Sequence, residues 1–496
     1  MAFGSPIFLF LFLPCLLLLF AAIPRRLQVA FLLCCSLFFY LWVEGRVLWV
    51  LLLIIAVTYG TGRAIASAKS TRKRKLLLGL GISVNLLVLL VLRYAGFFVE
   101  NLNVLLGLFG LSPAARPSLP HPLGISFFTF LAISFLIDSA RKKNRERPAF
   151  LSTSLYVSFF PTIMAGPITP FREMEPQLQS PSGRQFSFDE GVRRFIIGLG
   201  KKVLLADTLA KTAGAIFDIP GRDLTFAVSW LGISAYTLQI YFDFSGYTDM
   251  AVGLGRLLGF RFMENFRYPY ASTSVHDFWT RWHKSLTRWL RDYVYLPLAY
   301  RISRAIKSDR WLGFKADSVI YCTATSLTML ICGFWHGASW TFIIWGGYHA
   351  GALLLERFVW GKRLKRAWRP ARHLYAVLLI AVGWVLFRST NLGQALSFLK
   401  AMAGLNHGNP RLYVPALYLD PEKLAALAVG ILASTPLVPA LAKQWGRWRE
   451  KRKRLFSMIL EKGLALAQFL FLVALFVLSS MYIANETFKP FIYFRF

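Results

Sequence analysis

Long apolar runs without charge recur along the chain and set its class. Residues 7–23 ("IFLFLFLPCLLLLFAAI"), 76–92 and 465–484 contain no charged side chain. About 20 consecutive apolar residues cross the hydrocarbon core of a bilayer as a helix. The pattern predicts an all-α polytopic membrane protein with about eleven to thirteen transmembrane helices. The expected spans lie near residues 7–23, 28–43, 47–66, 76–98, 122–138, 151–166, 192–215, 225–243, 317–335, 338–358, 374–389, 423–441 and 464–484.

No internal repeat divides these spans, so we expect a single domain over residues 1–496. The first apolar run lacks a basic region before it and is followed by Arg25-Arg26. This order favours a first transmembrane helix over a cleaved signal peptide. The long polar segment 165–191 carries no pattern that assigns it to one side of the membrane.

Lysine and arginine gather in the short segments between the apolar runs. Cytoplasmic loops of membrane proteins collect these residues, and basic segments follow the first, third and fifth spans. The pattern places the N-terminus outside and the basic loops in the cytoplasm. The net charge of 57 − 24 = +33 is thereby explained by topology, without nucleic-acid binding. The basic segments are Arg25-Arg26, 72–75, 141–147, 362–372 and 447–454.

The five cysteines lie within or beside apolar runs and lack the spacing of metal ligands. They read as small buried hydrophobic residues. We therefore expect neither a bound metal nor a disulfide framework. The cysteines are Cys15, Cys34, Cys35, Cys322 and Cys332.

Residues 241–270 ("YFDFSGYTDMAVGLGRLLGFRFMENFRYPY") place Asp243, Ser245 and Asp249 in an apolar segment. Such groups must find partners or face a hydrated cavity inside a membrane. A satisfied hydrogen-bond network and the wall of a polar tunnel both fit this pattern. Pro269 and the mixed composition around it predict a loop or broken helix over 263–275.

Residues 276–298 ("HDFWTRWHKSLTRWLRDYVYLPL") predict one amphipathic helix in the membrane interface, ended by Pro297. Tryptophan and leucine fall on one face of this helix, and arginine and lysine on the other. His283 and Arg291 share a stripe because they are eight residues apart. His283 is either an ordinary interfacial histidine or a functional one.

The segment "GFWHGASW" (333–340) buries His336 between Gly333 and Gly337. Their GxxxG spacing predicts a close helix crossing, where the histidine serves either as a hydrogen-bonding group or as a catalyst. His349 points roughly 140° away on an unbroken helix, so it would join His336 only if the helix broke at Gly346-Gly347.

Together these blocks resemble bacterial membrane-bound O-acyltransferases (MBOAT), of the branch that includes the alginate O-acetyltransferase membrane subunit. The similarity also includes "FFPTIMAGPI" (159–168) and "GLGKKVLLADTLA" (198–210), and it covers most of residues 5–390. The resemblance implies a ring of transmembrane helices around a thin centre with a tunnel, plus interfacial helices. It makes residues 236–355 the catalytic core.

The resemblance also implies roles for single residues. His336 matches the histidine of the family's WHG motif, and His283 matches a second functional histidine. Positions expected along the substrate tunnel, on weaker grounds, are Asp243, Ser245, Asp249, Asn265, Arg291, Trp335 and His349. The chain departs from the family pattern at His276 and at Ala299-Tyr300-Arg301, which would alter docking of the acyl donor.

The expected activity is acyl transfer, with acetyl the favoured group and acetyl-CoA or another acyl thioester as the donor. A buried imidazole can take the proton of an attacking hydroxyl. No GxSxG elbow is present, so the resemblance implies an outward-facing serine-type acetyltransferase partner and an exported polysaccharide acceptor such as alginate, with no bound cofactor. Peptidoglycan, cellulose or D-alanyl transfer, and an ion- or proton-coupled transporter, are the alternatives.

Overall fold

Helices make up nearly all of the regular structure. The computed structural model describes residues 3–141, 147–179, 187–311, 313–406, 408–449 and 454–485. Within these residues the all-α prediction is confirmed, apart from a hairpin of strands β1 (Arg310–Trp311) and β2 (Phe314–Lys315). Most of the basic segment 141–147, and residues 450–453 of the last basic segment, lie outside the described residues.

The N-terminal helices form one packed group. Helices α3 (Leu48–Ser67) and α4 (Thr71–Leu89) pack on each other and on α6 (Ile125–Arg141). The Ser70 hydroxyl caps α4 by accepting a hydrogen bond from the backbone N–H of Lys73. The other elements of this region are α1 (Leu13–Ala22), α2 (Gln28–Glu44), the π-turn η4 (Leu90–Tyr94), α5 (Ala95–Leu108), α7 (Phe150–Ser158), α8 (Phe160–Ile163) and α9 (Phe171–Leu178).

A long buried helix, α12 (Phe226–Leu257), packs most extensively against α10 (Phe188–Gly200). Glycines on both helices bring the two backbones together. A Cβ added at Gly198 would lie 2.6 Å from the carbonyl oxygen of Gly246, so any larger residue would force the helices apart. The π-helical turn η5 (Lys201–Ala206) and helix α11 (Asp207–Phe217) follow α10 and also pack on α12.

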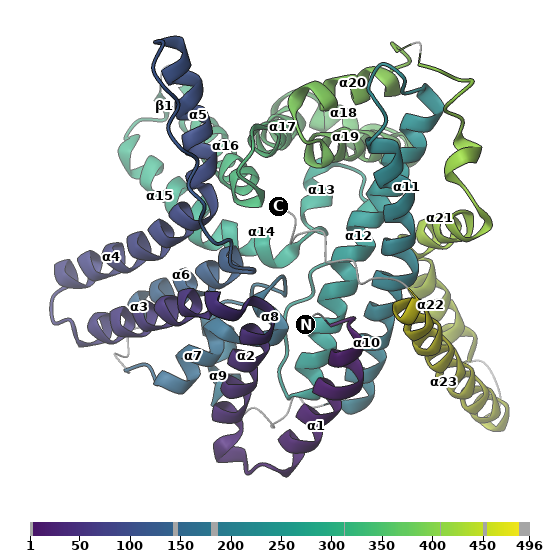
Figure 1. The fold of residues 1–496 in the computed structure, drawn as a ribbon, viewed down its shortest axis with the longest axis horizontal. Coiled ribbons are helices and arrows are strands. Elements are labelled where there is room, and N and C mark those ends of the chain that lie inside the picture. Colours follow the sequence, from purple (N-terminus) through teal and green to yellow (C-terminus); the bar gives the residue numbers. More distant parts are fainter. Residues whose placement is uncertain are drawn as a thin grey trace.

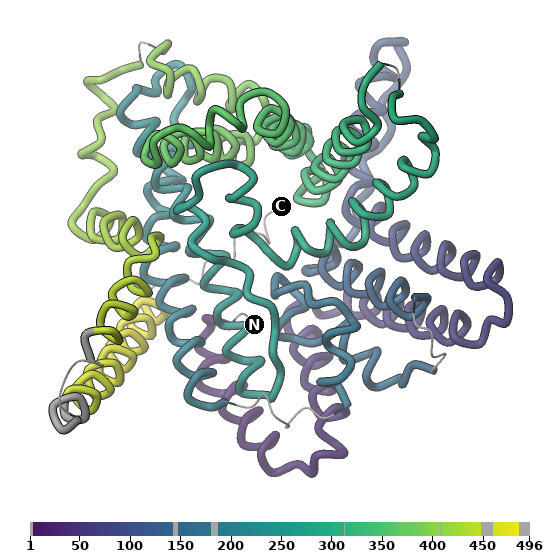
Figure 2. Tube along the Cα trace, turned by 180° about the vertical axis from the view of Figure 1, so that it is seen from behind, coloured from purple at the N-terminus to yellow at the C-terminus, as the bar shows by residue number. Residues whose placement is uncertain are grey.

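Figure 1 shows the remaining helices arranged around α13 and α14, which lie near the middle of the view. The reverse view in Figure 2 shows the green segments at the top and the purple N-terminal helices at the bottom. The predicted loop at 263–275 is confirmed, with a single 3₁₀ turn at Pro269–Ala271. The elements are α13 (Val275–Trp279), α14 (Lys284–Leu290), the π-turn η7 (Arg291–Tyr295), α15 (Leu296–Ala305), α16 (Ala316–His336), α17 (Trp340–Leu355), η8 (Glu356–Trp360), α18 (Gly361–Arg366), α19 (Arg369–Arg388), α20 (Leu392–Met402), α21 (Pro421–Ala433), α22 (Leu437–Arg449) and α23 (Arg454–Asn485).

Among the described residues, five helical segments are long and apolar enough to cross a membrane, or six if one bent pair forms a single span. This number is smaller than the eleven to thirteen crossings predicted. The segment Arg25–Ser67 joins two of the expected spans, and two others fold as shorter helices, since α7 has 9 residues and α17 has 16. The segments are Arg25–Ser67, Thr71–Leu108, Ala316–His336, Arg369–Arg388 and Leu460–Asn485, and the bent pair is Pro421–Ala433 with Leu437–Arg447.

Candidate active site

His336 is the last residue of α16, and the chain turns directly after it into α17. The close helix crossing predicted from the GxxxG spacing is confirmed at Gly333, where an added Cβ would lie 2.3 Å from the carbonyl oxygen of Phe342. Gly337 has extended backbone and packs against the ring of Phe342 instead of a neighbouring backbone. The crossing joins the two arms of one hairpin, and His336 lies at its tip.

Aromatic rings enclose the His336 imidazole, and the residue is only 4% exposed. Its ring centroid lies 4.8 Å from that of Trp335 and 5.1 Å from those of Trp345 and Phe387. An imidazole among hydrocarbon and aromatic surfaces is favoured in its neutral form. The ring is therefore held in its neutral form, the form that can accept a proton.

His349 lies in the same aromatic group, which corrects the reasoning from an unbroken helix. The break occurs at 337–339, not at Gly346-Gly347, and α17 runs through the two glycines without interruption. His349 and His336 both contact Trp345, with centroid separations of 4.8 and 5.1 Å. His349 is buried against Trp279 at 5.2 Å, so one indole links the two histidines.

The single interfacial helix predicted for 276–298 is wrong, because the chain breaks at 280–283. His283 has φ +42°, a left-handed conformation that is uncommon for a residue with a side chain. Such a conformation costs on the order of 1–3 kcal/mol and occurs preferentially at functional sites. Pro297 does not end the helix either; it lies in the first turn of α15, which continues to Ala305.

The break directs His283 into the protein, where it is fully buried. Its ring meets Phe244 edge-on at 4.6 Å and lies 6.2 Å from the ring of Trp335. Neither ring nitrogen hydrogen-bonds another residue in the part of the chain that the structure describes. His283 lies outside the membrane-spanning helices, and burial lowers its pKa to about 3. The imidazole is neutral, and its two nitrogens lack a partner on any other described residue.

Asn265 fixes this turn. Its side-chain oxygen accepts a hydrogen bond from the backbone N–H of Ser285 at 3.1 Å, and its carbonyl oxygen accepts one from Lys284 at 2.9 Å. These bonds cap the start of α14 and hold His283 in place. Arg291, by contrast, does not join His283: it is exposed and its guanidinium bonds Asp292 at 2.8 Å.

Arg93 and Tyr94 were not among the predicted site residues, yet they hold the end of α16. The Arg93 guanidinium donates to the carbonyl oxygen of His336 at 2.9 Å and also bonds the hydroxyl of Ser126. The Tyr94 hydroxyl donates to the carbonyl oxygen of Phe334 at 3.0 Å. A helix ends with unsatisfied carbonyls and partial negative charge, which a cation there stabilises. The feature of the sequence that could have identified Arg93 is its position directly after the uncharged apolar run 76–92.

Asp243 and Asp249, both on α12, form ion pairs with basic side chains of α10 and η5. Asp243 pairs with Lys202 at 2.7 Å, and Asp249 pairs with Lys201 and Arg194, each at 2.7 Å. The satisfied-network interpretation is confirmed for these carboxylates, whereas their role in a tunnel wall stays a prediction. The hydroxyl of Ser245 has no hydrogen-bond partner among the described residues.

The structure thus brings together His283, Trp335, His336, Trp345 and His349, which we call the histidine cluster. Trp335 contacts both His283 and His336, and its indole N–H has no hydrogen-bond partner within the described residues. No group of three or more His, Cys, Asp or Glu side chains in the described part of the chain could hold a metal ion. The cluster offers imidazole nitrogens and two indole N–H donors, because the N–H of Trp345 has no hydrogen-bond partner among the described residues either.

Comparison with known proteins identifies relatives over most of the chain. Residues 25–387 match MBOAT, the membrane-bound O-acyltransferase family. The chain is 36% identical to a "Probable alginate O-acetylase AlgI" of Azotobacter vinelandii over the full length of both. It is 38% identical to the protein of that name from Pseudomonas aeruginosa, over 89% of this chain and 81% of the other. A "Peptidoglycan O-acetyltransferase" of Helicobacter pylori is 35% identical over 82% of this chain and 80% of the relative.

Proposed function

Because the chain belongs to the membrane-bound O-acyltransferase family, we propose that it moves an acetyl group from a cytosolic thioester across the membrane for O-acetylation of an exported polysaccharide. Alginate is the favoured polymer, because full-length relatives carry the name alginate O-acetylase. We place the protein in the bacterial inner membrane with its N-terminus outside, on the distribution of its basic segments.

The observation that carries this proposal is the meeting of His283 and His336 at Trp335. Two histidines from separate segments are buried in one aromatic enclosure, with rings 6.2 and 4.8 Å from the same indole. Two buried imidazoles are costly to bring together and would be replaced by apolar residues if only packing mattered. Their joint burial at a strained turn and a helix end favours catalysis.

In the proposed step a hydroxyl attacks the carbonyl carbon of the acetyl thioester. The His336 imidazole takes the hydroxyl proton as the new C–O bond forms, and the C–S bond then breaks. The imidazolium returns the proton to the departing thiolate, so the enzyme ends unchanged. Such base catalysis contributes roughly 10²–10⁴-fold in rate. In this proposal the oxyanion accepts a hydrogen bond from the indole N–H of Trp335, which has no partner among the described residues.

The sequence has no GxSxG nucleophile elbow, so we assign the final transfer to polysaccharide to an outward-facing serine-type acetyltransferase. This partner would receive acetyl at the outer side of the membrane. Peptidoglycan is the second candidate acceptor, since the H. pylori relative is named for it.

Labelled acetyl-CoA supplied at the cytosolic face of proteoliposomes tests the proposal. With the outward-facing serine-type acetyltransferase enclosed on the opposite side, we expect label on a hydroxyl acceptor there, and alginate and peptidoglycan fragments are offered in parallel. Ion or proton flux in the absence of acylation would contradict acyl transfer and support an ion- or proton-coupled transporter. Label transfer to peptidoglycan alone would retain the activity and change the polymer.

A further inference from the structure

We propose that Glu356 is a positioning residue for acetyl transfer: it anchors helix α13 and, through it, sets Trp279 and His283 relative to the rest of the histidine cluster. This inference rests on the proposed function and adds a residue that lies one position beyond the expected catalytic core, 236–355. Glu356 begins η8, directly after the apolar end of α17, and is only 7% exposed. A buried carboxylate is costly unless protein groups compensate its charge.

The compensation comes from the backbone of α13, which precedes Glu356 by 80 residues in the chain. One carboxylate oxygen accepts the N–H of Val275 at 2.6 Å, and the other accepts the N–H of His276 at 3.0 Å. The following N–H, of Asp277, bonds the hydroxyl of Ser274 at 2.9 Å. The first N–H groups of a helix have no partner within it and carry partial positive charge, so a carboxylate is favoured there.

Helix α13 depends on such an anchor because it has only five residues. A helix this short is not stable by itself, since nucleation costs more than its few hydrogen bonds return. Apolar contacts contribute as well: Val275 is fully buried, and the ring of Phe278 stacks on that of Trp282 at 5.5 Å. Apolar packing is not directional, whereas the two bonds to Glu356 fix where the helix begins.

The two ends of α13 meet the same arm of the structure, formed by α17 and η8. The first residues of α13 bond Glu356, and its last residue, Trp279, lies 5.2 Å from the ring of His349 and 5.8 Å from that of Trp345. His349 and Glu356 are seven residues apart, which places them on one helical face about 10 Å from each other along the axis. A shift of α13 at Glu356 therefore moves Trp279 relative to His349.

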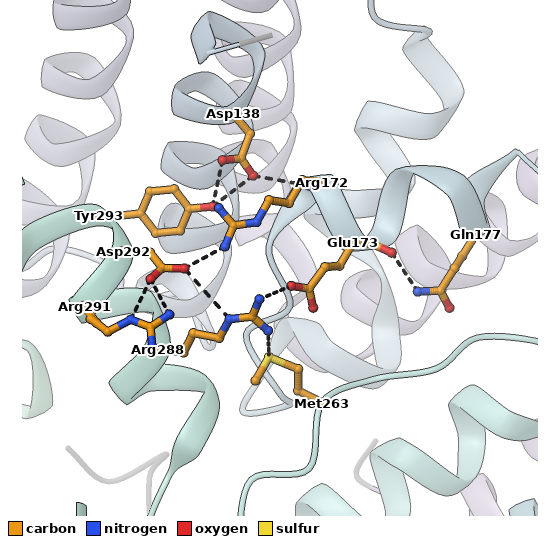
Figure 3. A network of polar contacts seen from close by, with 9 residues as sticks. All are labelled: Asp138, Arg172, Glu173, Gln177, Met263, Arg288, Arg291, Asp292 and Tyr293. Atoms are coloured by element: carbon orange, nitrogen blue, oxygen red, sulfur yellow. Dashed lines mark hydrogen bonds and ion pairs between the residues drawn. The ribbon is translucent and has the colours of Figure 1, made fainter. Parts of the chain in front are cut away.

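The segment that carries His283 is fixed independently at its other end. His283 comes four residues after α13 ends. Further along, Asp292 of η7 pairs with Arg172 of α9 at 2.6 Å. Figure 3 shows this pair within a polar network that joins η7 to α6 and α9. With the far end held there, the position of the His283 turn depends on the near end, which Glu356 anchors through α13.

The first arm of the test needs no turnover and uses the full chain in nanodiscs. In Glu356→Ala we expect the amides of Val275 and His276 to exchange hydrogen at least tenfold faster, because they lose their acceptors. The ring signals of His349 and His283 should shift in histidine-labelled protein, since Trp279 and the His283 turn move. The seven histidines of the chain give few signals, and the signal of His121 serves as the reference.

The second arm measures acetyl transfer in proteoliposomes. In Glu356→Ala kcat should fall about 10–100-fold with little change in KM, since a misplacement of about 1 Å in a catalytic group costs about 10²-fold. Glu356→Gln keeps one accepting oxygen, so its exchange rates and kcat should lie between those of the alanine variant and the unaltered protein.

Asp420→Ala is the matched control. The Asp420 carboxylate accepts the backbone N–H of Lys423 at 2.8 Å and so caps α21, as Glu356 caps α13. Its removal should leave exchange in α13, the histidine signals and kcat as they are in the unaltered protein.

Two results would overturn the proposal. One is unchanged exchange at Val275 and His276 in Glu356→Ala, which would show that α13 does not need this carboxylate. The other is faster exchange with unaltered histidine signals and unaltered kcat, which would reduce Glu356 to a local structural contact. If Glu356→Ala fails to fold, Glu356→Gln decides by the same readouts, with an expected change of a few-fold.

The two arms also separate this inference from the proposed function. If the unaltered protein transfers no acetyl group while exchange and histidine signals change as expected, the proposed function fails and the anchoring of α13 by Glu356 is retained. If all Glu356 variants transfer acetyl at the rate of the unaltered protein, only this inference fails.

Discussion

Buried ionisable groups are treated in opposite ways on the two sides of α12. On one side, Lys202, Asp243 and Asp249 are matched with oppositely charged partners at 2.7 Å. On the other, His283 is buried among aromatic rings and neither of its ring nitrogens hydrogen-bonds another described residue. Paired charges inside a protein hold helices together, whereas an unsatisfied polar group is tolerated where a ligand completes it. The comparison separates the residues that build the fold from those that serve the chemistry.

The largest effect is expected at His336. His336→Gln keeps the size of the side chain and a polar group but removes the base, so the rate of acetyl transfer should fall roughly 10²–10⁴-fold. Transfer from acetyl-CoA in proteoliposomes measures this change, with thermal unfolding as the check on folding. The matched control is His121→Gln, an exposed histidine in the loop before α6, which should keep full activity. An active, folded His336→Gln protein would exclude the imidazole as the base.

At the pair between Lys202 and Asp243 we expect a loss of stability without a specific loss of acetyl transfer. Lys202→Met removes the cation that pairs with Asp243 at 2.7 Å, and breaking a comparable buried pair costs about 3–5 kcal/mol. The thermal midpoint in detergent should drop strongly. Lys202→Met/Asp243→Leu should recover part of the loss because both buried charges are removed, while Asp207, the second carboxylate paired with Lys202 at 2.8 Å, remains. Arg222→Met disrupts only the exposed pair with Asp223 and should leave the midpoint unchanged. A stable Lys202→Met protein with impaired transfer would instead place this ion pair in the reaction.

A smaller effect is expected at Arg93, which acts on His336 through the backbone. Arg93→Gln removes a charge-assisted hydrogen bond worth about 1.5–3 kcal/mol, so kcat should fall about 10–100-fold with little change in KM. Arg93→Lys retains the cation and should restore part of the rate. Steady-state kinetics on folded protein separate this positioning role from loss of structure. Loss of structure would reduce the active fraction of Arg93→Gln and of Arg93→Lys alike.

The smallest effect is expected at Asn265, the cap of α14. Asn265→Ala removes the oxygen that accepts from Ser285, at a cost of about 1 kcal/mol, and the transfer rate should fall several-fold as the His283 turn loosens. Asn265→Asp keeps the accepting oxygen and should retain the rate. If the aspartate variant loses as much as the alanine variant, the amide N–H₂ of Asn265 is the important group.

Local pattern was sufficient for part of this picture. The apolar runs predicted helices, GxxxG predicted the close crossing at Gly333, and Pro269 lay in the loop expected for it. The resemblance to the family, and not local pattern, pointed to His336 and His283, the two histidines that meet at Trp335.

The rest depends on contacts between distant parts of the chain. The left-handed turn at His283 is held by Asn265, and the amphipathic pattern of 276–298 contains no sign of it. Arg93 bonds a carbonyl 243 residues further along, so the partner could not be read from its neighbours. Asp243 and Asp249 pair with cations on η5 and α10, and this network could be recognised only once the helices were packed.

The central claim is that His283 and His336 act as one unit, and a double-mutant cycle tests it most directly. Transfer rates would be measured for His283→Gln, His336→Gln and the double variant in the same proteoliposomes. The account predicts that the double variant loses no more rate than the more damaging single change, as groups within one catalytic unit do. Losses that multiply, or full activity in either single variant, would contradict it.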